Sequence, residues 1–209
     1  MIRPLRVNIM STARRQRIGP ADQGRVLTWE AFLDAEEEEG CKYELAKGVL
    51  EVTSIPRISH RRVTSNLYGL AAEYRREHPG VIDFFGGTSE FRITIPAMRI
   101  SRHPDLGIAS LGAPLETSGD ILTGLAAEVV SPSSRKHDYE AKRREYLPYG
   151  LREYWIVDPD MLRLTLLSPV ETEGEPRWSD RPFEGDEPIV SPMLPGLDAP
   201  GSRLWARSK

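Results

Sequence analysis

The chain has 209 residues, of which 39% are apolar, and this is enough for one domain with a hydrophobic core. Its formal net charge of −3 excludes a protein that binds polyanions through overall charge, so nucleic-acid affinity would need a local basic patch. The single cysteine, Cys41, excludes an intrachain disulfide, and no apolar run approaches the ~20 residues that cross a membrane.

Residues 1–25 are polar and rich in arginine, without periodicity, which predicts a loose basic tail. A single domain is expected over residues 26–200, followed by a loose C-terminus at 201–209. Arg14 and Arg15 are not followed by the apolar segment of a secretory signal, so a cytoplasmic location and no membrane contact are expected.

The first half of the chain predicts two helices around a hairpin. Residues 26–40 are expected to be helical, with Thr28 as the N-cap. Residues 43–45 and 49–52 are expected to form the two strands of a hairpin, with the turn at 46–48. Residues 59–78 carry an apolar stripe at helical spacing, formed by Val63, Leu67, Leu70, Ala71 and Tyr74.

Strands are predicted next at residues 81–85 and 90–95, around Gly86 and Gly87. The chain lacks a phosphate-binding Gly-Lys-Ser/Thr loop, a Gly-x-Ser-x-Gly elbow and a His-Glu-x-x-His pair. These absences argue against nucleotide hydrolysis, serine hydrolysis and zinc proteolysis.

Two further predicted strands each carry an acid. Residues 103–109 form a strand entered through Pro104, with Asp105 near its start. Residues 125–130 form a buried apolar strand, in which alternation places Glu128 on the same face as Ala126 and Val130. An ionised carboxylate there is costly unless a cation, a metal or hydrogen bonds compensate it.

After the serine-rich turn at 131–134, a helix is predicted from about residue 135 to about 147. Steps of three and four place Lys142 on its inward side, together with Tyr139, Tyr146 and Tyr149. The lysine either faces the strand acid or covers the sheet with its stem while its ammonium reaches water. Residues 153–157 and 163–167 then predict a hairpin, and 171–188 a long polar connection.

Carboxylates on neighbouring strands are the oxygen ligands that Mg²⁺ or Mn²⁺ prefers. Asp105 and Glu128 are therefore the candidate metal ligands, and the backbone carbonyl of Val129 offers a third oxygen. The combined spacing resembles a bacterial restriction-endonuclease-like family within the PD-(D/E)xK nuclease superfamily, from about residue 43 to 197. The matching positions are Pro104-Asp105, Glu128 to Ser134, Asp138, Lys142, Tyr146, Gly150 and Glu153 to Pro159.

This resemblance implies an α/β fold with a restriction-endonuclease-like mixed central β-sheet flanked by helices, plus an added C-terminal hairpin. It also implies metal-dependent hydrolysis of phosphodiester bonds in nucleic acid, with DNA as the expected substrate and Mg²⁺ or Mn²⁺ as cofactor. Most of the superfamily places a lysine two residues after the strand acid, where this chain has Val130. Lys142, which matches a lysine of the family, is the candidate replacement.

Two more catalytic candidates come from the resemblance. Glu44 matches a glutamate near the active centre, whose expected role is to hold a metal or a water on it; otherwise it is an exposed acid on a hairpin strand. His60 matches a histidine position and is expected to contact phosphate or such a water; otherwise it is a surface residue at a helix start.

Nucleic-acid binding is assigned to a basic rim made of Arg57, Arg61, Arg62, Arg135, Lys136, Arg143 and Arg144. These basic residues alternate with acids along the chain, so a solvated charged surface is the competing interpretation.

Two rival functions stay open: a non-catalytic descendant of the fold that binds nucleic acid or protein, and an enzyme acting on another phosphate ester. Retention of both acids favours the nuclease. Assembly into a homodimer is also left open by the sequence.

Overall fold

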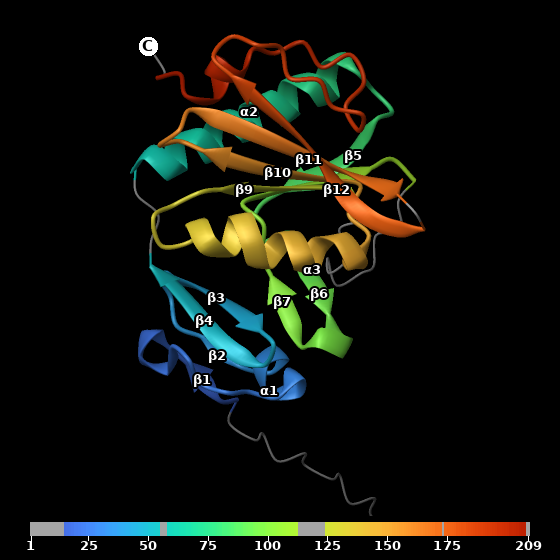
Figure 1. The fold of residues 1–209 in the computed structure, drawn as a ribbon. Helices are drawn as coiled ribbons and strands as arrows, with labels where there is room; N and C mark the ends of the chain where they lie inside the picture. Colours follow the sequence, from blue (N-terminus) through green and yellow to red (C-terminus); the bar gives the residue numbers. More distant parts are fainter. Residues whose placement is uncertain (1–14, 55–57, 113–123, 173, 208–209) are drawn as a thin grey trace, which may run out of the picture.

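The structure is a computed structural model of the chain, and it describes residues 15–54, 58–112, 124–172 and 174–207. Two sheets dominate the described part (Figure 1). The helix α3 (Lys142–Tyr149) lies between them, and the helix α2 (Ile58–Glu77) lies on the opposite side of the larger sheet.

The larger sheet is mixed and has the described strand order β12-β11-β10-β9-β8-β5. Strands β9 and β10 run parallel, and the other neighbours are antiparallel. Its strands are β5 (Ile82–Gly86), β8 (Leu106–Ser110), β9 (Leu125–Val129), β10 (Glu153–Asp158), β11 (Arg163–Thr172) and β12 (Glu175–Glu184). The expected mixed central sheet is present, and β10 and β11 form the predicted hairpin.

The two faces of β9 pack against different helices, as its alternation predicts. Leu125, Ala127 and Val129 join the core cluster that contains the buried stripe of α2. Ala126 and Val130 join the cluster that contains Tyr146 of α3. Glu128 therefore points toward the helix that carries Lys142. That helix begins with one wide turn over His137–Ala141, where the Lys142 N–H donates to the His137 carbonyl.

The smaller sheet has the described order β4-β3-β7-β6 and its own core. Its strands are β3 (Cys41–Ala46), β4 (Val49–Ser54), β6 (Ile93–Ile95) and β7 (Ile100–Arg102). The predicted hairpin of β3 and β4 turns at Lys47 and Gly48, which have positive φ angles of 52° and 83°. Positive φ at both central residues matches the right-handed twist of the strands.

The predicted helix over residues 26–40 is wrong in its length. Only α1 (Trp29–Leu33) is helical, although the Thr28 hydroxyl does cap it by accepting from the Ala31 N–H at 3.1 Å. Acids near a helix C-terminus oppose the helix dipole. Instead, β2 (Glu36–Glu37) pairs in parallel with β1 (Arg17–Ile18), so this part of the expected loose tail is ordered and Ile18 is buried.

Three other expectations are corrected. The strand expected at 90–95 is shortened to β6 and belongs to the smaller sheet. The expected polar connection at 171–188 contains β12, an edge strand whose side chains are mostly exposed, so no apolar alternation marks it. The C-terminal segment expected to be loose packs through Leu204, which is buried within the 3₁₀ turn Gly201–Leu204. No described helix is long and apolar enough to cross a membrane.

Candidate active site

A cleft of about 700 Å³ opens where the smaller sheet meets the larger one. Its walls come from β3, the start of α2, the segment before β8, the end of β9 and the serine turn that leads into the α3 helix. The cleft brings together all the residues that the sequence predicted as catalytic, which are Glu44, His60, Asp105, Glu128 and Lys142.

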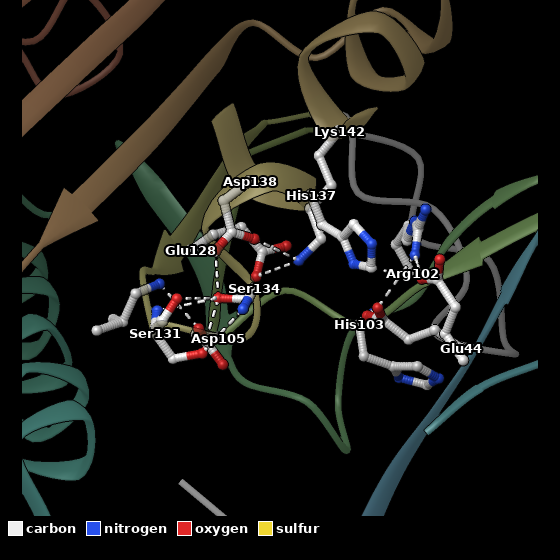
Figure 2. A network of polar contacts seen from close by, with 12 residues as sticks. Glu44, Arg102, His103, Asp105, Glu128, Ser131, Ser134, His137, Asp138 and Lys142 are labelled. Carbon is white, nitrogen blue, oxygen red and sulfur yellow. Dashed lines mark hydrogen bonds and ion pairs between the residues drawn. The ribbon is translucent and has the colours of Figure 1, made fainter. Parts of the chain in front are cut away.

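Lys142 contacts the strand acid directly. Its Nζ lies 2.9 Å from Glu128 Oε2 and 3.0 Å from Asp138 Oδ1 (Figure 2). The Tyr146 hydroxyl donates to the other oxygen of Glu128 at 2.8 Å. Glu128 is 1% exposed and Lys142 4% exposed, so this is a buried ion pair rather than a solvated lysine. The ammonium lies where the sequence spacing predicted it.

The two central acids differ in their electrostatics. Burial raises the pKa of Glu128 to about 7, although Lys142 and Lys42 oppose the shift. Burial also opposes ionisation of Asp105, but Lys42 and His60 outweigh it and lower the pKa of Asp105 to about 2. Asp105 is therefore ionised at neutral pH, whereas burial works against ionisation of Glu128 and its charge depends on the neighbouring lysines. Burial lowers the pKa of Lys142, but Asp138 and Glu128 reverse this and raise it well above its usual value.

Asp105 is held by two donors on one oxygen. His60 Nε2 lies 3.1 Å from Asp105 Oδ2, and the Val129 N–H donates to the same oxygen at 2.8 Å. The second contact ties the entry of β8 to the end of β9. His60 therefore orients an acid of the cleft from the first turn of α2.

Glu44 is not an exposed hairpin acid; it is 4% exposed. Its Oε1 accepts the His103 N–H at 2.9 Å and lies 3.3 Å from Lys42 Nζ. Its Oε2 lies 3.3 Å from Arg102 Nη1. Burial opposes ionisation, but Lys42, Lys142 and Arg102 together lower the pKa of Glu44 well below its usual value.

Arg102 joins the smaller sheet to the α3 helix. It is 1% exposed and donates to Glu145 twice, with Nε at 2.8 Å and Nη2 at 3.0 Å. It also contacts Glu44 and Glu51. Glu145 follows Lys142 by three residues on the same helix, so Arg102 holds together the elements that carry Glu44 and Lys142.

Sequence analysis did not single out Lys42 or Arg102, and it named Asp138 only as a position that matches the family, without a role in the site. Lys42 lies two residues before Glu44 and thus on the same strand face, a signal that was available. Asp138 precedes Lys142 by one helical turn, which is the spacing of a helical ion pair. Arg102 had no local signal, because its partners lie at least 43 positions away in the chain.

The described residues of the expected basic rim do not line the cleft. Of the residues that the structure describes, those lining the cleft include neither the arginines of α2 nor the basic residues expected from the α3 helix. Arg135 instead contacts Asp158 and Asp160, and Arg143 contacts Asp180. Arg57 lies outside the described residues. The described basic side chains of the cleft are Lys42, Lys142, His60, His103 and His137.

The fold and this site together define a class, an α/β protein with a restriction-endonuclease-like sheet, one acid at the start of β8, one acid on the adjacent β9, and a lysine from the following helix. The family model of Uma2, described as "Putative restriction endonuclease", matches residues 29–202, and the chain belongs to this family.

One solved structure with a similar fold is that of "a putative nuclease belonging to DUF820" from Anabaena variabilis. The TM-score is 0.67 and the identity 20%, over 86% of this chain and 97% of the other. A search of curated proteins gives no match. At this identity the structural match supports the fold, and the family match supports the membership.

The buried position of Arg102 generates a stability prediction. Arg102→Met should lower the free energy of unfolding by about 3–5 kcal/mol, because it leaves Glu145 buried without its cation and removes one of the donors to Glu44. The exposed pair of Arg163 and Glu184 gives the control, and Arg163→Met should cost less than about 1 kcal/mol. Chemical denaturation measures both, and equal effects would contradict the role given to Arg102.

Proposed function

We propose that this protein is a divalent-metal-dependent endonuclease that hydrolyses phosphodiester bonds in nucleic acid, with DNA as the expected substrate. The observation that carries the proposal is the contact of the Lys142 ammonium with Glu128, beside Asp105, in an open cleft. Family membership supports the same reaction class. An acid pair with an adjacent fixed cation is what phosphodiester hydrolysis requires.

Asp105 and Glu128 are the residues that would hold Mg²⁺ or Mn²⁺. No group of three or more described His, Cys, Asp or Glu side chains is arranged to hold an ion. Two carboxylates nevertheless fit Mg²⁺, which keeps several waters and takes further oxygens from substrate phosphates. When bound, a divalent ion supplies the Lewis-acid chemistry, which is activation of water and neutralisation of phosphate charge.

The side chains around the acids have separate tasks in this proposal. Lys142 brings a permanent positive charge that stabilises negative charge developing on the phosphate. Tyr146 and Asp138 fix the position of Glu128 and Lys142 through their contacts. His60 and the Val129 N–H orient Asp105 so that its other oxygen faces the cleft. Preorganisation of this kind lowers the cost of reaching the transition state.

Loss of either acid should abolish cleavage. Asp105→Asn and Glu128→Gln should each lower the rate at least about 1,000-fold, because a bound metal contributes several kcal/mol of charge stabilisation. The assay uses single- and double-stranded DNA and RNA with Mg²⁺ or Mn²⁺. Glu77→Gln, at an exposed position of α2, is the control and should cleave normally. A wild-type protein that binds nucleic acid but cuts none of these would favour the non-catalytic binding function.

The variant Lys142→Met tests the role of the Lys142 ammonium in cleavage. The rate should fall at least about 100-fold, the scale for losing one preorganised electrostatic partner. Thermal stability should also fall, since Glu128 and Asp138 would lose a buried counter-charge. Cleavage is therefore measured at temperatures where circular dichroism shows the variant folded. Lys136→Met, at an exposed position of the same helix, should change only the salt dependence of binding. Normal cleavage by the Lys142→Met variant would rule out Lys142 as the cation that the reaction needs.

A further inference from the structure

A second lysine, Lys42, lies among the acids of the cleft. Lys42 Nζ is 3.3 Å from Glu44 Oε1 and 4.0 Å from Asp105 Oδ1. Its side chain is 22% exposed and lines the same cleft. The ammonium therefore lies between two carboxylates, one from the smaller sheet and one from the larger.

The strand fixes this lysine in place. Lys42 and Glu44 are two positions apart on β3, so their side chains leave the strand on the same face. β3 is paired with β4 on one side and β7 on the other, and it is thus an interior strand of its sheet. Moving the ammonium away from Glu44 would require rotation of the lysine stem rather than movement of the backbone.

Glu44 contacts three donors from the protein, whereas Glu128 contacts two, Lys142 and Tyr146. One oxygen accepts the His103 N–H and faces Lys42, and the other faces Arg102. Figure 2 shows Glu44, Arg102 and His103 as one group, apart from the group of Glu128, Asp138 and Lys142. A metal ion between Glu44 and Asp105 would have to displace the Lys42 ammonium and compete with these donors.

Two-metal phosphodiester sites place ions ~3.5–4 Å apart, with carboxylates shared between them. Asp105 accepts the Val129 N–H at the end of the strand that carries Glu128, and it shares the Lys42 ammonium with Glu44, so it connects the two other acids. We infer that Lys42 takes the place of a second metal ion: the cleft binds one divalent ion, at Asp105 and Glu128, and the Lys42 ammonium provides the positive charge between Asp105 and Glu44. This inference rests on the proposed metal-dependent function and specifies how many ions the site takes.

The role of Glu44 changes accordingly. It is a positioning residue that holds Lys42 against Asp105, whereas the family resemblance implied a residue that holds a metal or a water on it. A lysine carries one charge and needs no ligand shell, whereas Mg²⁺ demands near-octahedral oxygen ligands. The hydrogen bonds from His103 and Arg102 therefore suit a carboxylate that pairs with a lysine.

The test is the number of Mn²⁺ ions bound by the full chain, measured by titration calorimetry and by electron paramagnetic resonance of free Mn²⁺. Wild-type protein should bind one ion. Lys42→Ala should bind two, because removal of the ammonium leaves Glu44 and Asp105 facing each other without their shared cation. Lys42→Gln also removes the positive charge and should likewise bind two ions, so it replaces the alanine variant if that variant does not fold. Lys47→Ala, exposed on the turn of the same hairpin, is the control and should bind one.

Two bound ions in the wild type would overturn this inference and leave the nuclease proposal standing. One ion in the wild type and in both folded Lys42 variants would also overturn it. No bound ion in the wild type, together with no cleavage, would contradict the proposed metal-dependent function itself and this inference with it.

Discussion

The buried contact between Lys142 and Glu128 is the constraint on which the rest of the site depends. A carboxylate in the middle of a central strand, 1% exposed, is tolerated only with a partner that carries positive charge or donates hydrogen bonds. The helix that follows β9 supplies both, through the Lys142 ammonium and the Tyr146 hydroxyl. Because Glu128 needs such a partner, the face of the helix that carries Lys142 and Tyr146 points to the sheet. The same contact leaves a fixed cation beside an acid pair at the base of a cleft.

A second buried cation extends this arrangement across the two sheets. Arg102 reaches Glu145 on the α3 helix and Glu44 on β3, so helix and smaller sheet are tied by charge as well as by packing. The smaller sheet has its own apolar core and contributes Glu44 and Lys42 to the cleft. Its position relative to the larger sheet therefore sets the geometry of the site. Buried arginine pairs of this kind cost desolvation, which is consistent with a functional rather than purely stabilising role.

Local periodicity predicted the elements that are buried on a defined face. The stripe of α2, the alternation of β9 and the inward side of Lys142 all follow from spacing along one element, and all appear in the structure. Periodicity does not predict an element whose side chains are exposed on every face, because no apolar pattern then marks it. The edge strand β12 has mostly exposed side chains and therefore looks like a loop in the sequence.

Contacts between distant parts of the chain were the main gap in predicting the site. Arg102 meets acids at least 43 positions away, and its buried state cannot be read from its neighbours. The basic residues expected at a nucleic-acid rim are charged in any arrangement, so sequence could not show that Arg135 and Arg143 contact other acids. The family resemblance correctly pointed to Glu44 in the cleft, but not to the donors that surround it.

The central claim is that Asp105 and Glu128 hold the metal, with Lys142 beside them. Anomalous diffraction from crystals of the wild-type protein soaked in Mn²⁺ tests it most directly. One strong anomalous peak is expected in contact with the carboxylates of Asp105 and Glu128, with the Lys142 ammonium still adjacent to Glu128. A peak bound elsewhere, or none at these two acids while the Lys142–Glu128 pair stays closed at saturating Mn²⁺, would contradict it.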